Sequence, residues 1–230
     1  MKLKNKIKAL IFDFDGLILE TEEPVYRSWQ ELFAELNCSL PFENWATIIG
    51  SSENFFDPFD LLEEQFGQAV NRKELGRRRF QRETELVQMQ PILPGVLDYL
   101  QDAKRIGLRM AVASSSSNEW VTGHLKRLGI FGYFDRIVTR DDVERTKPDP
   151  ELFLKALEVL SARPEQAIVF EDSPNGLAAA HAAGIFCVAV PNPLTRRLDL
   201  SQADLEIESL ASLPLEKLLK RIEDISPTKM

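Results

Sequence analysis

The sequence predicts an α/β fold in which a doubly wound parallel sheet carries an inserted all-helical cap domain. Beyond residue 95, helix and strand patterns alternate, which is typical of a parallel sheet covered by helices on both faces. From residue 23 to about residue 89 the pattern is helical, and no strand signal interrupts it. This helical block follows the first predicted strand, so it interrupts the series. We expect an α/β core made of residues 1–16 and 91–230, and a helical cap made of residues 17–90.

The hydrophobic pattern sets the order of the core elements. The apolar run from Ile7 to Phe12 stops at acidic residues and Gly16, which indicates a buried strand that ends in a loop. Pro94 and Gly95 mark the point where the series resumes. Further strands are expected at 108–113, 136–139, 167–170 and 185–190, with a weak one at 204–207. Helices are expected at 95–105, 117–128, 150–160, 174–183 and 215–225.

The cap is predicted to be helical because its apolar residues recur at helical spacing. Trp29, Leu32, Phe33 and Leu36 fall on one face of its first helix. Further helical segments are expected at 55–66 and 71–88. Two linkers, near residues 16–22 and 88–94, join the cap to the core, and this connection implies a lid that can move.

Composition and charge restrict the class of partner. The 230-residue chain has a formal net charge of −8 and a pI near 5.0, which argues against a nucleic-acid partner. No stretch is long and apolar enough to span a membrane, and acidic residues end the first apolar run too early for a signal peptide. Cys38 and Cys187 are too few for a disulfide framework or a cysteine-based zinc site, so a reducing cytoplasm fits best.

Polar side chains follow several of the predicted strands at the point where each strand ends. In open α/β sheets ligands bind at the carboxyl ends of the strands, so these side chains should share one crevice. Each motif alone has an ordinary explanation as a turn or a helix cap. Together they supply carboxylates, hydroxyls and one lysine to the same place. The set consists of Asp13 and Asp15; Ser114, Ser115 and Ser116; Lys147; and Glu171 and Asp172.

A crevice with this many carboxylates requires a cation. Two like charges about 4 Å apart repel by roughly 4 kcal/mol at an effective dielectric near 20. Oxygen ligands alone favour Mg²⁺, whereas zinc would need His or Cys. The two histidines, His124 and His181, lie inside predicted helices and are interpreted as packing or surface residues. This excludes a Ser/His/Asp or Cys/His catalytic site.

Four motifs occur in a fixed order, and together they are highly specific. They are IFDFDG with Asp13 and Asp15, VASSSS with Ser114, KPDP with Lys147, and VFEDSPNG with Glu171 and Asp172. Between Ile7 and about Pro191 the chain resembles the haloacid dehalogenase superfamily, in the phosphatase and phosphomutase branch that has a helical cap after the first strand. The resemblance implies a Mg²⁺-dependent phosphohydrolase that forms an aspartyl-phosphate intermediate. Its substrate would be a small phosphorylated metabolite, for which a sugar phosphate is one candidate.

The resemblance also implies a role for each matched residue. Asp13 would be the nucleophile, and Asp15 would act as general acid and then as general base. Ser114 and Ser115 would bind the phosphoryl oxygens, and Lys147 would bind them too while offsetting the charge of Asp13. The Mg²⁺ ligands would be Asp13, Asp15 through its backbone carbonyl, Asp172 and, in the inner or outer sphere, Glu171.

Three positions in the cap depart from the family pattern. Glu20 stands where the family usually has Asp, which affects the packing of the hinge more than phosphoryl transfer. β-Phosphoglucomutases that the chain resembles have a His where this chain has Val25, and an Arg where it has Glu53. These changes favour hydrolysis over the alternative, a phosphosugar mutase. A non-catalytic regulatory module on the same fold is a second alternative.

The cap also contains a basic run whose role the sequence leaves open. Its residues are Arg72, Lys73, Arg77, Arg78, Arg79 and Arg82, interleaved with glutamates. A solvated helix face explains this run best, although some of the arginines could face the cleft and attract an anionic substrate. We expect a cytoplasmic monomer whose partner is a small phosphorylated metabolite.

Overall fold

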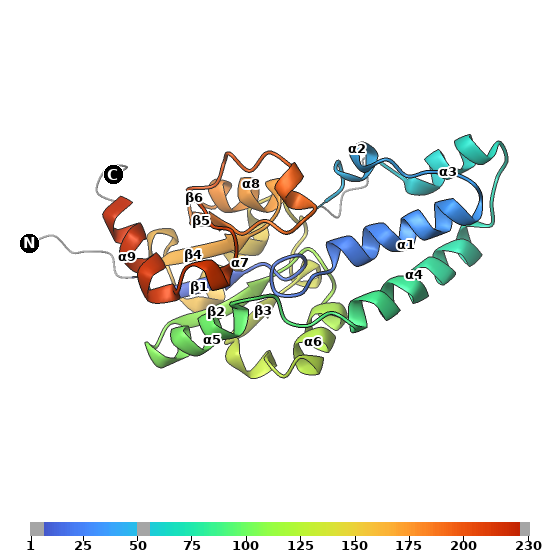
Figure 1. The fold of residues 1–230 in the computed structure, drawn as a ribbon. Coiled ribbons are helices and arrows are strands. Elements are labelled where there is room, and N and C mark those ends of the chain that lie inside the picture. Colours follow the sequence, from blue (N-terminus) through green and yellow to red (C-terminus); the bar gives the residue numbers. More distant parts are fainter. Residues whose placement is uncertain (1–6, 50–55, 226–230) are drawn as a thin grey trace, which may run out of the picture.

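The computed structural model describes residues 7–49 and 56–225. Within these residues one sheet contains six parallel strands in the order β3-β2-β1-β4-β5-β6 (Figure 1). The strands are β1 (Ala9–Phe12), β2 (Arg109–Ala113), β3 (Arg136–Val138), β4 (Ala167–Glu171), β5 (Phe186–Ala189) and β6 (Leu205–Glu206). The weak strand predicted near residue 205 is therefore present, paired with β5 at the sheet edge.

Four α-helices lie between β1 and the remaining strands, and five belong to the α/β series in the described part of the chain. The first group is α1 (Glu22–Glu35), α2 (Phe42–Trp45), α3 (Pro58–Phe66) and α4 (Arg72–Gln88). The second group is α5 (Val96–Arg105), α6 (Asn118–Arg127), α7 (Glu151–Leu160), α8 (Pro174–Ala182) and α9 (Leu215–Ile225). None of the helices that the structure describes is long and apolar enough to cross a membrane.

The sheet has helices on both faces because side chains alternate along each strand. Leu10 and Phe12 of β1 enter one hydrophobic cluster, together with side chains of α5, α6 and α9. Ala9 and Ile11 enter a second cluster, with side chains of α7 and α8. The adjacent central strands β1 and β4 are buried along their whole length, as the middle of a doubly wound sheet requires. The predicted fold class is confirmed.

Helices α1 to α4 share a separate hydrophobic cluster, and they extend away from the sheet in Figure 1. Trp29, Leu32 and Phe33 of α1 are buried in it, as their spacing predicted. The two connections to the core run side by side, because Leu19 pairs with Ile92 and the amide of Leu93 donates to the carbonyl of Ile18 at 3.0 Å.

One helix of the cap was not predicted, and another begins later than expected. Helix α2 has only four residues, which are too few to show a helical period. Helix α3 begins at Pro58 because the side chain of Asp57 accepts a hydrogen bond from the amide of Phe59. Residue 55, where this segment was expected to begin, lies outside the described residues.

Candidate active site

Asp13 is the first residue after β1 and lies where the strand ends at the carboxyl edge of the sheet. Its amide donates to the carbonyl of Phe170 at 3.0 Å, which fixes it beside the neighbouring strand β4. The buried ammonium group of Lys147 donates to the Asp13 carboxylate and, at 2.6 Å, to Oε1 of Glu171. One lysine thus serves two carboxylates, and all three residues are buried.

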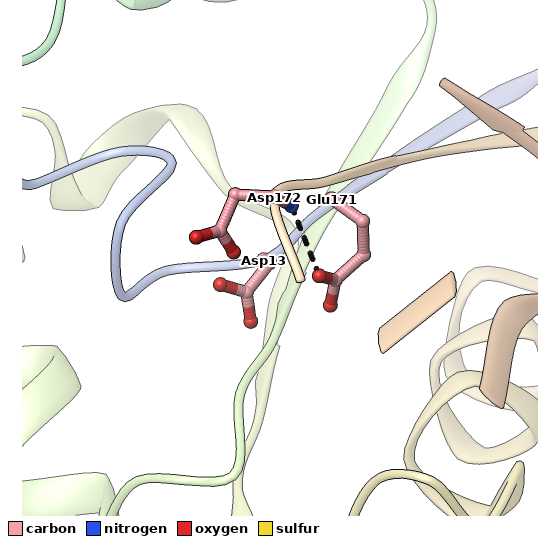
Figure 2. A group of neighbouring side chains, drawn as sticks. All are labelled: Asp13, Glu171 and Asp172. Carbon is pink, nitrogen blue, oxygen red and sulfur yellow. Dashed lines mark hydrogen bonds between the residues drawn. The ribbon is translucent and has the colours of Figure 1, made fainter. Parts of the chain in front are cut away.

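Glu171 and Asp172, at the end of β4, hold their carboxylates in different ways. Oε2 of Glu171 accepts hydrogen bonds from the amides of Asp172 and Ser173 and from the Ser173 hydroxyl, at 3.0 to 3.2 Å. Both Glu171 oxygens are therefore already used by the protein. Figure 2 shows the carboxylates of Asp13 and Asp172 on one side and that of Glu171 on the other. Oxygen atoms of the three lie within 4.8 Å of one another.

Two glycines allow this close approach. A Cβ on Gly16, which has a φ of +78°, would lie 2.4 Å from Oδ2 of Asp172. A Cβ on Gly176, in the first turn of α8, would lie 1.9 Å from the carboxyl carbon of Glu171. The glycines of the IFDFDG and VFEDSPNG motifs are therefore needed for space around the carboxylates.

Burial and like charge raise the pKa values of these acids. The pKa of Asp13 is raised to about 8, chiefly by burial and also by Glu171 and Asp15, although Lys147 opposes the shift. The pKa of Asp172 is raised well above its usual range by burial and by neighbouring carboxylates. Burial alone would lower the pKa of Lys147, but the charges of Asp13 and Glu171 raise it above its ordinary value.

The donor set fits a hard divalent cation. Asp13 and Asp172 present carboxylate oxygens on a common side, and the protein supplies one ammonium group against three buried carboxylates. Acids whose pKa is raised by burial and mutual repulsion are those that a divalent cation would stabilise in the charged form. The structure thus contains a buried acidic cluster that could hold a metal ion, as the Mg²⁺ prediction requires.

The carboxylate of Asp15 is held by three hydrogen bonds. Oδ2 accepts from the hydroxyls of Ser114 at 3.1 Å and Ser116 at 2.7 Å, and Oδ1 accepts from the indole nitrogen of Trp120 at 3.0 Å. Ser114 therefore contacts Asp15 in this structure. The hydroxyl of Ser115 is buried and has no hydrogen-bond partner among the described residues. The structure brings all the predicted strand-end residues to one edge of the sheet.

Three further polar residues at this site, Trp120, Asn192 and Glu22, were not predicted from the sequence. Trp120 gave no signal, because a tryptophan in a helix is usually a packing residue. Asn192 lies just beyond β5, and its amide donates to Oδ2 of Asp172 at 2.7 Å; the strand-end rule could have found it. Glu22 begins α1, and its pKa is raised to about 8 by burial and then by Asp15, Glu20 and Asp13. Glu22 thus adds a fifth carboxyl group, from the cap, close to the four of the core.

The histidines and cysteines take no direct part in the cluster of carboxylates. His124 packs between Trp120 and Phe14, with ring centroids 4.4 and 6.3 Å away, and His181 is exposed. Cys38 and Cys187 are free thiols.

Glu20, which departs from the family pattern, caps the first helix of the cap. Its side chain is buried, and Oε1 accepts from the amide of Glu23 at 3.1 Å. This bond satisfies one of the free amides at the start of α1. That the longer side chain alters the packing of the hinge stays a prediction.

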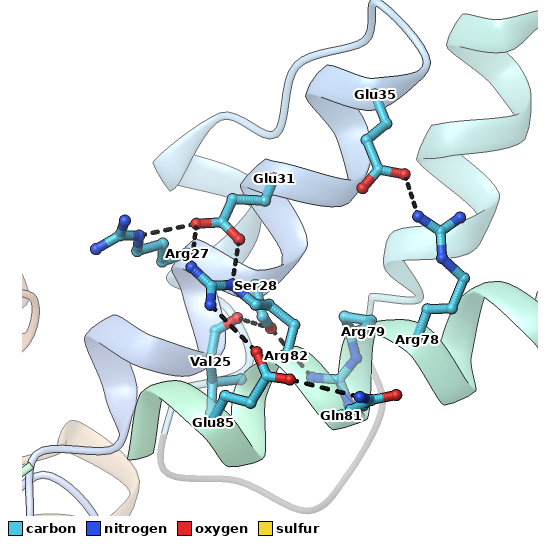
Figure 3. A network of polar contacts seen from close by, with 10 residues as sticks. All are labelled: Val25, Arg27, Ser28, Glu31, Glu35, Arg78, Arg79, Gln81, Arg82 and Glu85. Carbon is cyan, nitrogen blue, oxygen red and sulfur yellow. Dashed lines mark hydrogen bonds and ion pairs between the residues drawn. The ribbon is translucent and has the colours of Figure 1, made fainter. Parts of the chain in front are cut away.

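Most arginines of the basic run are tied into ion pairs on the outside of the cap (Figure 3). Arg78 pairs with Glu35, and Arg82 pairs with Glu31 and Glu85. Elsewhere Arg72 pairs with Asp57, Asp60 and Glu63, and Arg77 pairs with Glu74. Arg79 differs, because it is largely buried, pairs with Glu83 and lies 4.9 Å from the ring centre of Trp29.

Comparisons with known proteins agree with this geometry. The chain matches the haloacid dehalogenase-like hydrolase family over residues 10–190. It is 46% identical over 216 residues to "Putative phosphatase YhcW" of Bacillus subtilis (strain 168), a match that covers 94% of this chain and 98% of that protein. It is 30% identical over 226 residues to "Phosphorylated carbohydrates phosphatase" of Thermotoga maritima, covering 95% and 100% of the two chains.

Among solved structures, a β-phosphoglucomutase of Clostridium difficile superposes with a TM-score of 0.75 at 26% identity, covering 95% of this chain and 98% of that one. The chain belongs to the haloacid dehalogenase-like hydrolases, as its motifs predicted. It is an enzyme of that family, and the non-catalytic alternative is not favoured.

Proposed function

We propose that this protein hydrolyses the phosphate ester of a small phosphorylated metabolite, with a sugar phosphate as the preferred class. The observation that carries the proposal is the pairing of Lys147 with both Asp13 and Glu171, at a sheet edge where Asp15 follows Asp13 by two residues. The names of the relatives, which include a phosphatase of phosphorylated carbohydrates, support the same reaction class.

Asp13 acts as the nucleophile in this proposal. Its carboxylate oxygen forms a bond to phosphorus while the bond from phosphorus to the leaving oxygen breaks, and Asp15 gives its proton to that oxygen. Asp15 then takes a proton from water as the water oxygen attacks phosphorus and the bond to Asp13 breaks. Inorganic phosphate leaves, and both carboxyl groups return to their starting state.

Lys147 and the metal site would balance the charge of the phosphate. Lys147 already contacts Asp13, so a phosphoryl group bound there would lie close to its ammonium group. Asp13, Asp172 and the backbone carbonyl of Asp15 would hold Mg²⁺, and Glu171 would orient its neighbours from the outer sphere. When bound, Mg²⁺ would offset negative charge on the transferring phosphoryl group.

Hydrolysis is preferred over mutase activity because of the cap. Val25, at the position of the mutase histidine, contributes an apolar side chain to the cap cluster and has no ring nitrogen. Glu53, the other departure, lies outside the described residues. Without the histidine and the arginine of the mutases, the cap offers a second phosphate group fewer charge-assisted hydrogen bonds.

The test has two arms. Release of inorganic phosphate from a panel of sugar phosphates should depend on Mg²⁺ and stop after thorough chelation; Ca²⁺ should inhibit, because it prefers a looser shell. Activity that survives chelation would contradict the metal assignment. With β-glucose 1-phosphate and a bisphosphate activator, formation of glucose 6-phosphate that outpaces phosphate release would show that the enzyme is a mutase.

A further inference from the structure

Trp120 holds one end of the Asp15 carboxylate, and the serines hold the other. Ser114 and Ser116 both donate to Oδ2, so they leave the carboxylate free to pivot about that oxygen. The indole N–H of Trp120 alone reaches Oδ1, at 3.0 Å. The orientation of the Asp15 carboxylate therefore depends on the position of one ring in the first turn of α6.

The Trp120 ring is in turn held by His124, one turn further along the same helix. The two rings meet edge to face, with centroids 4.4 Å apart and an interplanar angle of 73°. His124 is buried, and its Nδ1 accepts a hydrogen bond from Nε of Arg127 at 3.2 Å. This bond requires an unprotonated Nδ1 and fixes the orientation of the imidazole.

Arg127 connects this row of side chains to the end of the cap. Its guanidinium donates to the backbone carbonyls of Gln88 at 3.1 Å, Gln90 at 3.3 Å and Val87 at 3.4 Å. These carbonyls lie at the C-terminal end of α4 and in the linker beyond it, where a helix leaves acceptors unsatisfied and favours a cation. Continuous contacts thus run from the second cap linker to Asp15.

We propose that Trp120 is a positioning residue for Asp15, and that His124 and Arg127 couple its position to the linker that follows α4. A shift of α4 relative to the core would move the carbonyls that Arg127 binds, and with them His124 and the Trp120 ring. The inference rests on the proposed function, because it concerns the orientation in which Asp15 gives its proton to the leaving oxygen.

Two aryl phosphates separate this role from a structural one. Phenyl phosphate has a poor leaving group that needs a proton, whereas 4-nitrophenyl phosphate has a leaving group that departs without one. The kcat/KM for each reports the step in which Asp13 attacks. The ratio of the two values therefore measures how well Asp15 is positioned, and a general loss of folded enzyme does not change it.

The variants are Trp120→Phe, which keeps an aromatic ring but removes the N–H, and Arg127→Met, which releases the linker carbonyls. We expect each to lower kcat/KM for phenyl phosphate about tenfold while that for 4-nitrophenyl phosphate stays within about twofold. The double variant should lose less than the product of the single losses, since the two residues act along one path. Controls are Trp45→Phe, whose indole nitrogen has no partner among the described residues, and Lys126→Met, beside Arg127 on α6.

The outcomes distinguish the two proposals. Wild-type enzyme that releases phosphate from neither aryl phosphate nor any sugar phosphate of the panel would overturn the proposed function. Wild-type activity with an unchanged ratio in Trp120→Phe would overturn the positioning role alone. A changed ratio in Trp120→Phe with an unchanged ratio in Arg127→Met would overturn the coupling to the linker. If Trp120→Phe does not fold, the ratio in Arg127→Met decides, and an unchanged value there overturns the inference.

Discussion

Ion pairs at the sheet edge of the core differ from those on the outer face of the cap in one respect, their exposure to water. Lys147 is 2% exposed, and its partners Asp13 and Glu171 are 8% and 0% exposed. Arg78 and Glu35, which link α4 to α1, are 46% and 50% exposed. Removing one partner of a buried pair leaves an unpaired charge in a poorly solvated place, whereas water replaces the lost partner at the surface. Loss of one partner is therefore expected to cost much more at the core pair than at the cap pair.

The pair of Arg79 and Glu83 in the cap has an exposure between these extremes. Arg79 and Glu83 are 15% and 11% exposed, and the arginine also lies within 3.4 Å of the Ser28 hydroxyl. Burial raises the pKa of Glu83 although Arg79 opposes the shift, and the charge of Asp15 adds to the rise. Burial thus raises the pKa of a carboxyl group in the cap as it does in the core.

The largest effect is expected at the core pair, on activity. Asp13→Asn keeps the shape of the side chain but removes the nucleophilic charge, so kcat should fall by at least about 10³-fold. The free energy of unfolding should stay the same or rise, because one member of a cluster of like charges is neutralised while Lys147 keeps its pair with Glu171.

The measurement is phosphate release, with urea unfolding of the same sample. Asp98→Asn, on the exposed side of α5, is the matched control and should keep full activity. An Asp13→Asn enzyme with more than about a tenth of wild-type kcat would show that another group is the nucleophile.

The next effect is expected on stability. Lys147→Met removes the ammonium group between two buried carboxylates, and the free energy of unfolding at neutral pH should fall by about 3–5 kcal/mol. Urea unfolding in the presence of a chelator excludes a contribution from metal. The control is Lys155→Met, whose exposed pair with Glu158 should contribute no more than about 1 kcal/mol. Equal losses in the two variants would contradict the contrast between buried and exposed pairs.

Most of the fold and the meeting of the charged groups could be predicted from the sequence. The loops that follow the strands of a parallel sheet share an edge, so the sequence predicts Asp13, Lys147 and Glu171 close together. The contact between Trp120 and Asp15 could not be predicted in this way. It depends on where α6 begins, after the capping hydroxyl of Ser117, and on how the helix packs against the loop after β1. Helix α2 was missed because four residues show no period.

A smaller effect on stability is expected at the glycine beneath Glu171. Gly176→Ala places a Cβ 1.9 Å from the Glu171 carboxyl carbon, so the carboxylate must move, and the protein should lose about 1–3 kcal/mol. Gly123→Ala in α6 is the matched control, because nothing lies within 4 Å of its Cβ; it should gain about 0.5–1 kcal/mol from helix propensity. Thermal unfolding of the two variants side by side is the measurement. If the two variants were equally stable, the Glu171 carboxylate would be able to move away from the new Cβ at no cost in stability.

His124 should contribute to the dependence of stability on pH. Burial, and then the charge of Arg127, lower its pKa below the ordinary value of 6.5. Below pH 6.5 the unfolded chain therefore takes up a proton that the folded chain does not bind, so the free energy of unfolding falls as the pH falls toward the folded-state pKa. Above pH 6.5 this contribution to the pH dependence vanishes.

The comparison is between wild type and His124→Gln, by urea unfolding across the acidic to neutral range. The difference in stability between them should be constant above neutral pH and become smaller on acidification, since only the wild type loses this contribution. His181→Gln, at an exposed position, is the control for removing a histidine. A difference between wild type and His124→Gln that does not vary with pH would contradict a lowered pKa at His124.

The smallest effect is expected at the exposed pair of the cap. Arg78→Met breaks an ion pair of 2.7 Å between α4 and α1, yet both partners are about half exposed, so the loss should be only about 0.2–1 kcal/mol. Water solvates the remaining Glu35, and the free energy that the pair gains from attraction is reduced by the cost of ordering two long side chains. Raising the salt concentration should reduce even this loss, because exposed charges are screened, whereas the loss in Lys147→Met should change little with salt. Urea unfolding of both variants at low and high salt measures this. If the loss in Arg78→Met exceeded about 2 kcal/mol or did not respond to salt, the cap pair would belong with the buried pairs, and exposure would not explain the difference between the two regions.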